Sequence, residues 1–162
     1  MIRVKIEGVM LDLKSNLPII ILRDDGQRVL PISVGIFEAQ AIAFALEKVR
    51  IPRPLTHDLA KSIIEKLGSS LLRVEITELK GNTYFAQLVL TRDGEELKID
   101  SRPSDAIAIA LRLQAPIYAS ESLLVAKEIQ SRPIDDTEIT QFKEMLNKLT
   151  PNMLWKYLKE KR

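Results

Sequence analysis

Two alanine-rich segments, each placed directly after a set of strand-like segments, limit the folds open to this chain. Residues 41–46 (Ala-Ile-Ala-Phe-Ala-Leu) align with residues 106–111 (Ala-Ile-Ala-Ile-Ala-Leu) at a shift of 65 positions. The Asp-Gly turns at 25–26 and 93–94 lie 68 positions apart, so the match drifts by three residues. We interpret the pattern as an internal repeat of three strands and a helix. The alternative is that two alanine-rich helices simply resemble each other.

The first copy begins with segments whose residue pattern is typical of strands. Val4 and Ile6 alternate with charged residues, a period of two, and the second segment is rich in β-branched residues. Asp24-Asp25-Gly26 predicts a hairpin in which Gly26 adopts a positive φ. Pro31 has no N–H to donate to a ladder, so we place the third strand at a sheet edge or a bulge. The expected strands of the two copies cover residues 3–13, 18–22, 29–34, 71–79, 84–91 and 97–99.

Three helices are expected to pack on these strands. Residues 36–49 are rich in alanine and leucine and have few polar side chains, which predicts a largely buried helix. Thr56 as N-cap and Gly68 as C′ residue bound a second helix at 57–67, and residues 102–113 form the third. The expected apolar face of the second helix consists of Leu59, Ala60, Ile63, Ile64 and Leu67.

The chain is therefore expected to adopt an α+β fold in which two strand-strand-strand-helix repeats form a mostly antiparallel sheet. The 57–67 helix is inserted between the copies, and C-terminal helices follow at 135–149 and from Thr150. We divide the chain into a domain at 1–130 and a helical extension at 131–162. Further short strands are expected at 116–119 and 122–126.

Composition excludes several classes of protein. Of the 162 residues, 46% are hydrophobic and 28% are charged, as in a soluble globular domain. No apolar run approaches the ~20 residues that cross a bilayer, and the N-terminus lacks the apolar core of a secretory signal. We therefore expect a cytoplasmic protein with no membrane partner. Since there is no cysteine and only one histidine, disulfides, thiolate metal sites, cysteine nucleophiles and two-histidine sites within one subunit are excluded. With a net charge of +2, nucleic-acid binding requires a local basic patch.

The first candidate site lies at residues 99–105, where a strand ends and a helix starts. Free N–H groups and the positive end of the helix dipole suit a bound anion there, and Arg102 can add a bidentate phosphate contact. Asp100 and Asp105 supply oxygen ligands for a divalent cation. The structural alternative is that Pro103 and the two residues after it are ordinary first-turn residues of a helix.

The second candidate site lies at residues 52–58, a proline-rigid segment that leads into the second helix. It brings Arg53, Thr56 and His57 to another helix N-terminus. Helical spacing puts His57 on the apolar face, toward the core or a crevice, and Asp58 on the solvent face. The structural alternative is a hydrogen-bonded histidine at the edge of the core.

Two further charged residues occur on otherwise apolar helices. Glu38 lies in the first turn of the 36–49 helix, where it complements the helix dipole or joins a carboxylate cluster. Arg112 follows Asp105 by two turns on the same helical side, ~10 Å along the axis, so the two cannot pair directly unless something lies between them. We expect Asp105 and Arg112 to line a crevice.

Three motifs of the chain resemble the bifunctional nuclease (BFN) domain family. They are residues 35–43 (GIFEAQAIA), 52–59 (PRPLTHDL) and 99–108 (IDSRPSDAIA). The resemblance covers roughly residues 1–130, with Lys48 where a glycine is common and Ser101 where an alanine is common. It implies nuclease activity on DNA and RNA, and nucleic acid as the partner.

The chemistry of the matching residues leads us to expect hydrolysis of phosphodiester bonds. The expected catalytic residues are His57, as general base or acid, with Asp105 and Asp100. The expected phosphate-binding residues are Arg53, Arg102, Ser104 and Thr56. A divalent cation, Mg²⁺ or Mn²⁺, held by Asp100, Asp105 and Glu38, would activate water and stabilise the leaving oxygen.

The same helix N-termini leave a second function open, a non-catalytic regulatory module that binds an anion or a partner. A chelator separates the two, because the metal-assisted hydrolase would lose activity and the binding module would not. A third interpretation is that the motifs are only caps and turns. We also expect a homo-oligomer, with a dimer favoured, because Pro31 marks an exposed edge and the 150–162 tail has an apolar side.

Overall fold

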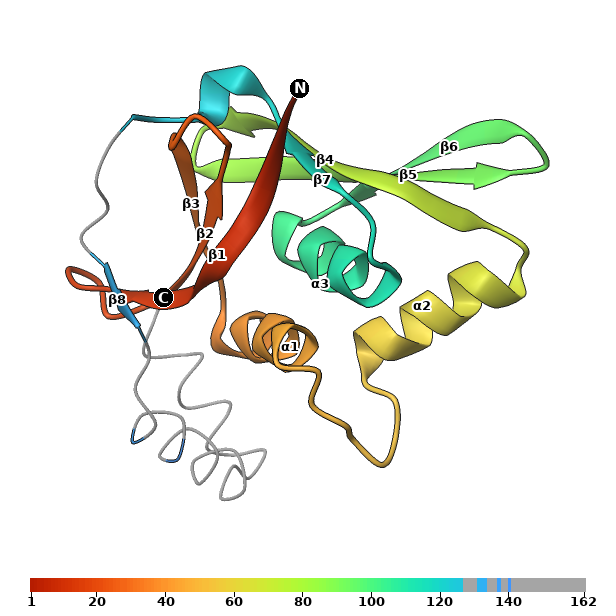
Figure 1. Cartoon of the computed structure of the whole chain (residues 1–162), viewed down its shortest axis with the longest axis horizontal. Helices are drawn as coiled ribbons and strands as arrows, with labels where there is room; N and C mark the ends of the chain where they lie inside the picture. The colour runs from red at the N-terminus through yellow and green to blue at the C-terminus, as the bar shows by residue number, and fades with distance from the viewer. Residues whose placement is uncertain (127–130, 134–136, 138–139, 141–162) are drawn as a thin grey trace. The chain divides into compact units, whose positions relative to one another are not determined.

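In the computed structural model, a unit of three strands followed by a helix occurs twice, and one further helix lies between the two units (Figure 1). The structure describes residues 1–126, 131–133, 137 and 140. The elements are β1 (Ile2–Asp12), β2 (Pro18–Arg23), β3 (Val29–Ser33), α1 (Ile36–Leu46), α2 (Thr56–Lys66), β4 (Ser70–Lys80), β5 (Thr83–Arg92), β6 (Glu95–Ser101), α3 (Pro103–Leu113), β7 (Ile117–Ala119), the short 3₁₀-helix η1 (Glu121–Leu123) and β8 (Ser131–Pro133). This is the predicted α+β element order.

Seven of the strands form one mixed, mostly antiparallel sheet in the order β3-β2-β1-β7-β4-β5-β6, and β8 pairs with β1 beside this path. β7 is antiparallel to β1 and parallel to β4, while the other pairs along the path are antiparallel. Each set of three strands starts beside β7 and runs outward from it. β1 and β4, on the two sides of β7, therefore point in opposite directions.

The three α-helices lie on the same side of the sheet, with α3 between α1 and α2 (Figure 1). α3 is the most buried of them, because its alternating alanines at 106, 108 and 110 allow close approach to neighbouring elements while Ile107 fills the core. The largest fully buried side chains of the main core are Ile20, Leu22, Leu30, Ile42, Val74, Ile76 and Ile107. Burying a side chain of this size stabilises the fold by about 1.5–3 kcal/mol.

The three-residue drift between the copies lies in the hairpin loops. Arg23 pairs with Val29, which leaves a five-residue loop, whereas Arg92 pairs with Glu95, which leaves two residues. In the short loop both Asp93 and Gly94 have positive φ, as a two-residue hairpin turn requires. In the long loop the residue with positive φ is Gln27, so the prediction for Gly26 is wrong. There the Asp24 carboxylate accepts a hydrogen bond from the Arg28 N–H (2.7 Å). Because this loop is longer, Gly26 does not need a positive φ.

Pro31 lies on β3, which ends the sheet, so the predicted edge position is confirmed. β3 is partly covered on its outer side, because Val29 and Val125 exchange two backbone hydrogen bonds of 2.9 Å. The strand predicted at 122–126 is wrong, since Glu121–Leu123 form η1 and only Val125 makes a β-bridge.

α2 begins at Thr56 with Leu55 as its N-cap, so the prediction of Thr56 as N-cap is wrong. The Asp58 carboxylate takes over the capping role by accepting a hydrogen bond from the Leu55 N–H (2.9 Å). Gly68 has the predicted C′ conformation, with φ of 73°. On the predicted apolar face only Ala60 and Ile64 pack against the core. The remaining members of that face, Leu59, Ile63 and Leu67, are exposed.

The chain divides into two compact units, residues 1–132 and 133–162. Within the described residues, no helix has the length and apolar character that spanning a membrane requires. The predicted helix at 135–149 falls outside the described residues except for Thr137 and Thr140, which are helical. The last predicted helix, from Thr150, lies entirely outside them.

α1 ends at Leu46, three residues earlier than predicted, and the chain turns at Lys48. Lys48 has φ of 51°, and the next N–H, that of Val49, bonds back to the Phe44 carbonyl (3.0 Å). This helix end favours glycine, which explains why a glycine is common at this position in the resembling family. The burial of α1 is also lower than predicted, since Ala39, Ala41 and Ile42 are its buried residues.

Replacing Lys48 by glycine is expected to stabilise the protein. A residue with a Cβ atom is strained in the left-handed conformation, and glycine is not. Lys48→Gly should raise the free energy of unfolding by about 1 kcal/mol in urea titration. Lys48→Ala, which removes the same charge and keeps the Cβ atom, is the control and should give no such gain. Equal effects of both substitutions would assign the change to the lysine charge.

Candidate functional site

The first turns of all three helices meet at one place and bring the predicted motifs together. His57, in the first turn of α2, lies with Nε2 2.9 Å from Oδ1 of Asp105 in the first turn of α3. Arg102 is the N-cap of α3, and Glu38 comes from the first turn of α1. The 52–58 and 99–105 segments, 48 positions apart at this contact, therefore form a single site.

Asp105 is the centre of this site because both of its carboxylate oxygens are engaged. Arg102 donates to Oδ2 from Nε (2.6 Å) and to Oδ1 from Nη2 (3.1 Å). The same guanidinium donates from Nη1 to Oε1 of Glu38 (3.0 Å), which joins α1 to α3. The charged side chains thus form a chain of contacts in the order Glu38, Arg102, Asp105, His57.

Gly35 makes room for Glu38 at the start of α1. A Cβ atom at position 35 would lie 2.2 Å from Oε2 of Glu38, which is closer than any real contact. A larger residue there would displace the carboxylate from its position beside Arg102. Gly35 thus leaves space for the Glu38 carboxylate in this position, and its φ of −69° is not an unusual backbone angle.

The contacts of Asp105 set its charge state. Burial by itself raises the pKa of the carboxyl, but the hydrogen bonds from Arg102 and His57 outweigh burial and hold the pKa below its ordinary value. The hydrogen bond to Asp105 raises the pKa of Arg102 in turn. Asp105 is therefore a carboxylate at neutral pH, suited to orient the imidazole of His57 and to stabilise its cationic form.

His57 is oriented so that only one of its ring nitrogens is used by the protein. Its side chain is 14% exposed and directs Nε2 to Asp105. Among the described residues no group bonds Nδ1, and every buried side-chain nitrogen or oxygen there has a partner. Nδ1 must therefore reach solvent. In the tautomer that donates from Nε2, Nδ1 is an unprotonated base open to a bound molecule.

Asp58 and Arg112 form a second link between α2 and α3. Nε of Arg112 donates to Oδ1 of Asp58 (2.6 Å), and Nη1 donates to the carbonyls of Ala41 (3.1 Å) and Ala108 (2.9 Å). The Arg112 side chain is only 8% exposed, so Asp58 faces this buried cation and the prediction that it lies on the solvent face is wrong. Asp105 and Arg112 of α3 therefore do not pair directly. Asp105 contacts His57 and Arg112 contacts Asp58, two consecutive residues of α2.

Asp100 is not part of the site. In β6 it lies opposite Gln87, on the face that carries Glu75, whereas the preceding residue, Ile99, lies opposite the buried Leu88. Successive residues of a strand point to opposite faces, so Asp100 points away from the side of the sheet that the helices cover. The sheet therefore separates Asp100 from Asp105 and Glu38, with which it was predicted to act.

The structure also shows how the predicted metal ligands are arranged. Nowhere in the described residues do three or more His, Cys, Asp or Glu side chains form a group that could hold a metal ion. Glu38 and Asp105 share the Arg102 guanidinium, which stands in the place predicted for the cation. In this arrangement the predicted set of Asp100, Asp105 and Glu38 does not fit a shared metal ion.

The predicted phosphate-binding residues are distributed differently. Arg102 has a 65% exposed side chain, and Arg53 is exposed without an ion pair to any described residue. Thr56 is exposed at the first position of α2, while Ser104 is buried in the first turn of α3. Three of the four can therefore reach a molecule at the surface.

The pairing of Asp58 with Arg112 was not predicted from the sequence. A signal was present, because Arg112 is the one basic residue of an otherwise apolar helix and Asp58 lies in the first turn of another. A buried guanidinium needs an anionic partner, and the periodicity of α2 alone does not reveal which of its faces meets α3.

The Asp58–Arg112 pair predicts a pH dependence of stability. Burial by itself raises the pKa of Asp58, but hydrogen bonds from Arg112 and from the Leu55 N–H outweigh burial and lower it. A carboxyl with a lowered pKa stabilises the fold above its ordinary value of about 3.9 and loses that effect as the pH falls through the folded value. The stability difference between wild type and Asp58→Asn should therefore be constant at neutral pH and shrink below about pH 4.

The measurement is urea unfolding of both proteins at a series of pH values. Asp25→Asn is the control, since the Asp25 side chain is 88% exposed and contacts only Lys5, itself exposed. That variant should differ little from wild type at any pH. A difference for Asp58→Asn that stays unchanged down to the lowest pH would show that the charge of Asp58 contributes nothing.

Known proteins are similar to this chain over most of its length. The model of the bifunctional nuclease domain matches residues 19–132. An uncharacterized protein of Mycobacterium tuberculosis strain H37Rv is 38% identical over 159 residues, covering 92% of this chain and 95% of that protein.

Plant relatives match a smaller part. Bifunctional nuclease 1 of Oryza sativa subsp. indica is 33% identical over 105 residues, 63% of this chain and 32% of the plant protein. Bifunctional nuclease 1 of Arabidopsis thaliana is 36% identical over 111 residues, 65% of this chain and 34% of that protein. The chain thus spans about a third of each plant protein. With its motifs joined in one site and the domain matched over residues 19–132, the chain belongs to the bifunctional nuclease domain family.

Proposed function

We propose that this protein is a nuclease that hydrolyses phosphodiester bonds of DNA, RNA or both at the site centred on Asp105. The observation that carries the proposal is the 2.9 Å contact between His57 and Asp105, with Arg102 on the same carboxylate. A carboxylate, an imidazole with a solvent-reaching nitrogen and an exposed arginine supply general base, orientation and charge stabilisation in one place. The family name and the names of the plant relatives support the same chemistry.

His57 is the general base in this proposal. Nδ1 takes a proton from the nucleophile, a water molecule or the 2′-hydroxyl of RNA, as its oxygen bonds to phosphorus. The bond to the leaving oxygen breaks, and that oxygen takes a proton from solvent. The imidazolium that forms is stabilised by the Asp105 carboxylate, which keeps its negative charge because its pKa is low.

Arg102 is the phosphate ligand in this proposal. Its guanidinium is exposed and reaches Glu38 and Asp105 from the N-cap of α3, beside the free N–H groups of that helix. Exchanging the Glu38 contact for a phosphate oxygen would keep the pair with Asp105 and place positive charge on the reacting group. Glu38 would then hold Arg102 in position while no substrate is bound.

A local basic segment next to the site fits a nucleic-acid backbone. The connection between α1 and α2 carries Lys48, Arg50 and Arg53, all exposed, and leads directly into His57. None of these three side chains forms an ion pair with another described residue, so their charge is open to phosphates. This segment supplies the local basic patch that a chain of low net charge requires.

One observation favours a second, structural interpretation of the same contacts. The His57–Asp105 and Asp58–Arg112 pairs both tie α2 to α3, and every charge in them is balanced. A site whose only role is to hold the helices, or to bind an anion without cleaving it, would show the same geometry. Paired measurements of stability and cleavage separate these possibilities.

His57→Gln and Asp105→Asn are expected to abolish most of the cleavage activity. Loss of the base, or of the group that orients it, removes about 10²–10⁴-fold in rate. Both variants should remain folded, because the contacts they lose are partly exposed and the core is unchanged. His57→Gln loses the bond to Asp105, and Asp105→Asn also loses the ion pair with Arg102. The measurement is the cleavage rate of DNA and RNA oligonucleotides together with the thermal midpoint of each protein.

Asp58→Asn is the matched control for these two variants. It also removes a first-turn carboxylate that joins α2 to α3, but it leaves the His57–Asp105 pair in place. We expect a lower thermal midpoint with cleavage retained. If His57→Gln and Asp105→Asn instead lower only the midpoint and cleave like wild type, the contacts are structural. If wild type binds oligonucleotides and cleaves none, the protein is a binding module.

Chelation tests the predicted requirement for Mg²⁺ or Mn²⁺. Arg102 lies between Glu38 and Asp105, Asp100 lies on the other face of the sheet, and the proposed steps use side chains alone, so cleavage should persist in EDTA. Rates with EDTA, with added Mg²⁺ and with added Mn²⁺ give the comparison, and binding measured in parallel controls for effects on the nucleic acid. Cleavage that stops in EDTA and returns with either ion would put the cation back into the mechanism.

A further inference from the structure

The two ends of the sheet are protected to very different degrees. β3 is five residues long, contains Pro31 and is bridged on its outer side by Val125. β6 at the opposite end is seven residues long, has no proline and pairs with β5 without a register shift from Ser101 to Glu95. Along β6 the described residues offer no partner on the outer side. A long, regular edge of this kind is a template for another strand.

The side chains of β6 divide cleanly between the two faces of the sheet. Leu97 and Ile99 lie opposite the buried Leu90 and Leu88, yet they are 42% and 47% exposed. Lys98 and Asp100 point to the other face, and neither forms a salt bridge with another described residue. The core face of the sheet thus continues outward to an edge where apolar side chains are uncovered.

We propose that β6 pairs antiparallel with β6 of a second copy of this chain, around a two-fold axis at Ile99. In this register Ile99 lies opposite Ile99 of the partner subunit, and Lys98 of each copy lies opposite Asp100 of the other. Directly opposite residues of an antiparallel pair share a face, so these charges meet on the polar face and the isoleucines on the apolar one. Of the three charges of β6 that form no salt bridge with another described residue, Lys98 and Asp100 thus find a partner in the dimer, and Glu95 does not.

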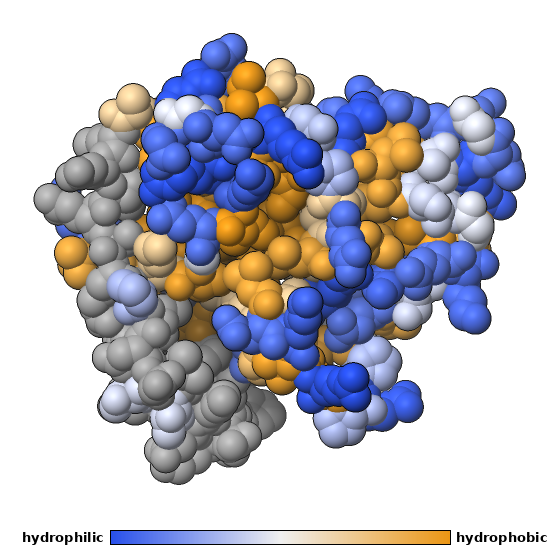
Figure 2. All heavy atoms as spheres, viewed as in Figure 1, coloured by the Kyte–Doolittle hydropathy of each residue, from blue (hydrophilic) through white to orange (hydrophobic). Residues whose placement is uncertain are grey.

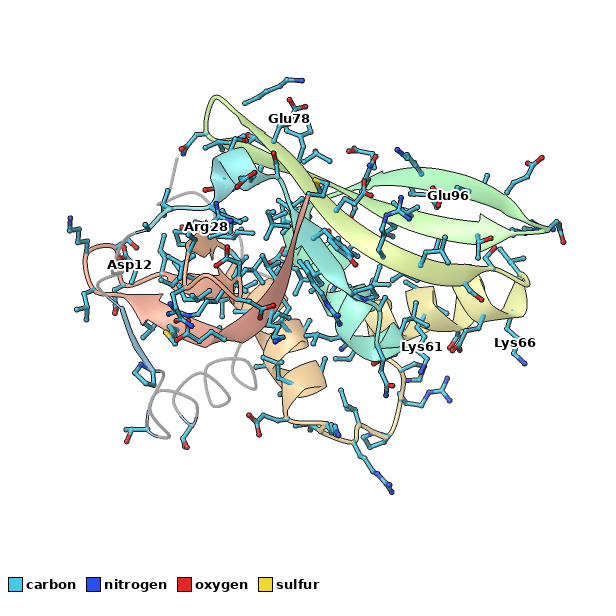
Figure 3. All side chains as sticks on the ribbon, turned by 45° about the horizontal axis from the view of Figure 1, so that its top comes forward. Asp12, Arg28, Lys61, Lys66, Glu78 and Glu96 are labelled. Carbon is cyan, nitrogen blue, oxygen red and sulfur yellow. The ribbon has the colours of Figure 1, made fainter. Side chains whose placement is uncertain are left out.

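Charge excludes or disfavours the neighbouring registers. A two-fold at Lys98 would place that lysine opposite itself and Glu96 opposite Asp100, which are repulsive pairs. A two-fold at Leu97 would place Glu96 opposite Lys98, but Glu96 is already held by Arg73 (3.1 and 3.3 Å), and Glu95 would face Ile99. Figure 3 labels Glu96 on the β5–β6 hairpin. It also labels Lys61 and Lys66 on α2, the helix described next.

A second apolar surface lies on α2, the helix nearest the hairpin in the view of Figure 1. It consists of Leu59, Ile63 and Leu67, which repeat every four residues and are all exposed. Figure 2 shows apolar residues at the surface on the side where α2 and the β5–β6 hairpin lie.

Charge reversal at positions 98 and 100 tests both the surface and the register. Lys98→Glu places two carboxylates opposite each other, the new one and Asp100 of the partner subunit. Asp100→Lys likewise places two ammonium groups opposite each other, and in both cases the repulsive pair occurs twice per dimer. Each substitution alone should raise the dissociation constant of the dimer about tenfold or more. Mixing the two single variants should restore association, because every pair in the mixed dimer is then opposite in charge.

The readout is the molar mass from light scattering and sedimentation equilibrium over a range of concentrations. The double variant, Lys98→Glu with Asp100→Lys, is the folding control and should also associate like wild type. A register at Leu97 would leave the double variant impaired, because Glu96 would face the carboxylate introduced at position 98. A monomeric wild type, or single variants that associate like wild type, would overturn the proposal. Circular dichroism of each variant shows that any loss is not unfolding.

Discussion

One buried guanidinium holds the helix layer together. Arg112, on α3, bonds the carboxylate of Asp58 on α2 and a carbonyl of α1, so a single side chain contacts all three helices. Removing such a cation from water is costly unless each of its donors is satisfied, and here the partners come from three elements. His57 precedes Asp58 directly, so the same turn of α2 that bonds Arg112 also contacts Asp105 through a separate hydrogen bond.

Each helix of the site carries an acid in its first turn: Glu38, Asp58 and Asp105. An acid there complements the helix dipole, so each residue has a local reason to be present. In the fold the same three carboxylates are the partners of Arg102, Arg112 and His57. Local helix stability and the geometry of the site therefore depend on the same residues, and stability and cleavage must be measured together to separate their roles.

Much of the fold and part of the site could be predicted from periodicity and helix-start patterns. The strands, α2 and α3 followed from such local signals, whereas the convergence of His57 with Asp105 did not and is known from the structure. Asp100 could not be separated from Asp105 in this way, because both flank the same strand-to-helix junction. Only the register of β6 shows that the strand sends Asp100 to one face while the following helix returns Asp105 to the other. The exposure of part of the apolar face of α2 could not be predicted either, because the sequence does not show how much of an apolar face another element covers.

The position of β7 has a consequence for how the chain can fold during synthesis. Among the described strands, β1 and β4 have no direct pairing, and the three residues of β7 join the two halves of the sheet. β7 follows α3, near the end of the 1–132 unit. The three-stranded halves can form early from local hairpins, but the sheet closes only when residues 117–119 have left the ribosome. Until then each half exposes an apolar strand edge that a chaperone or another nascent chain can bind.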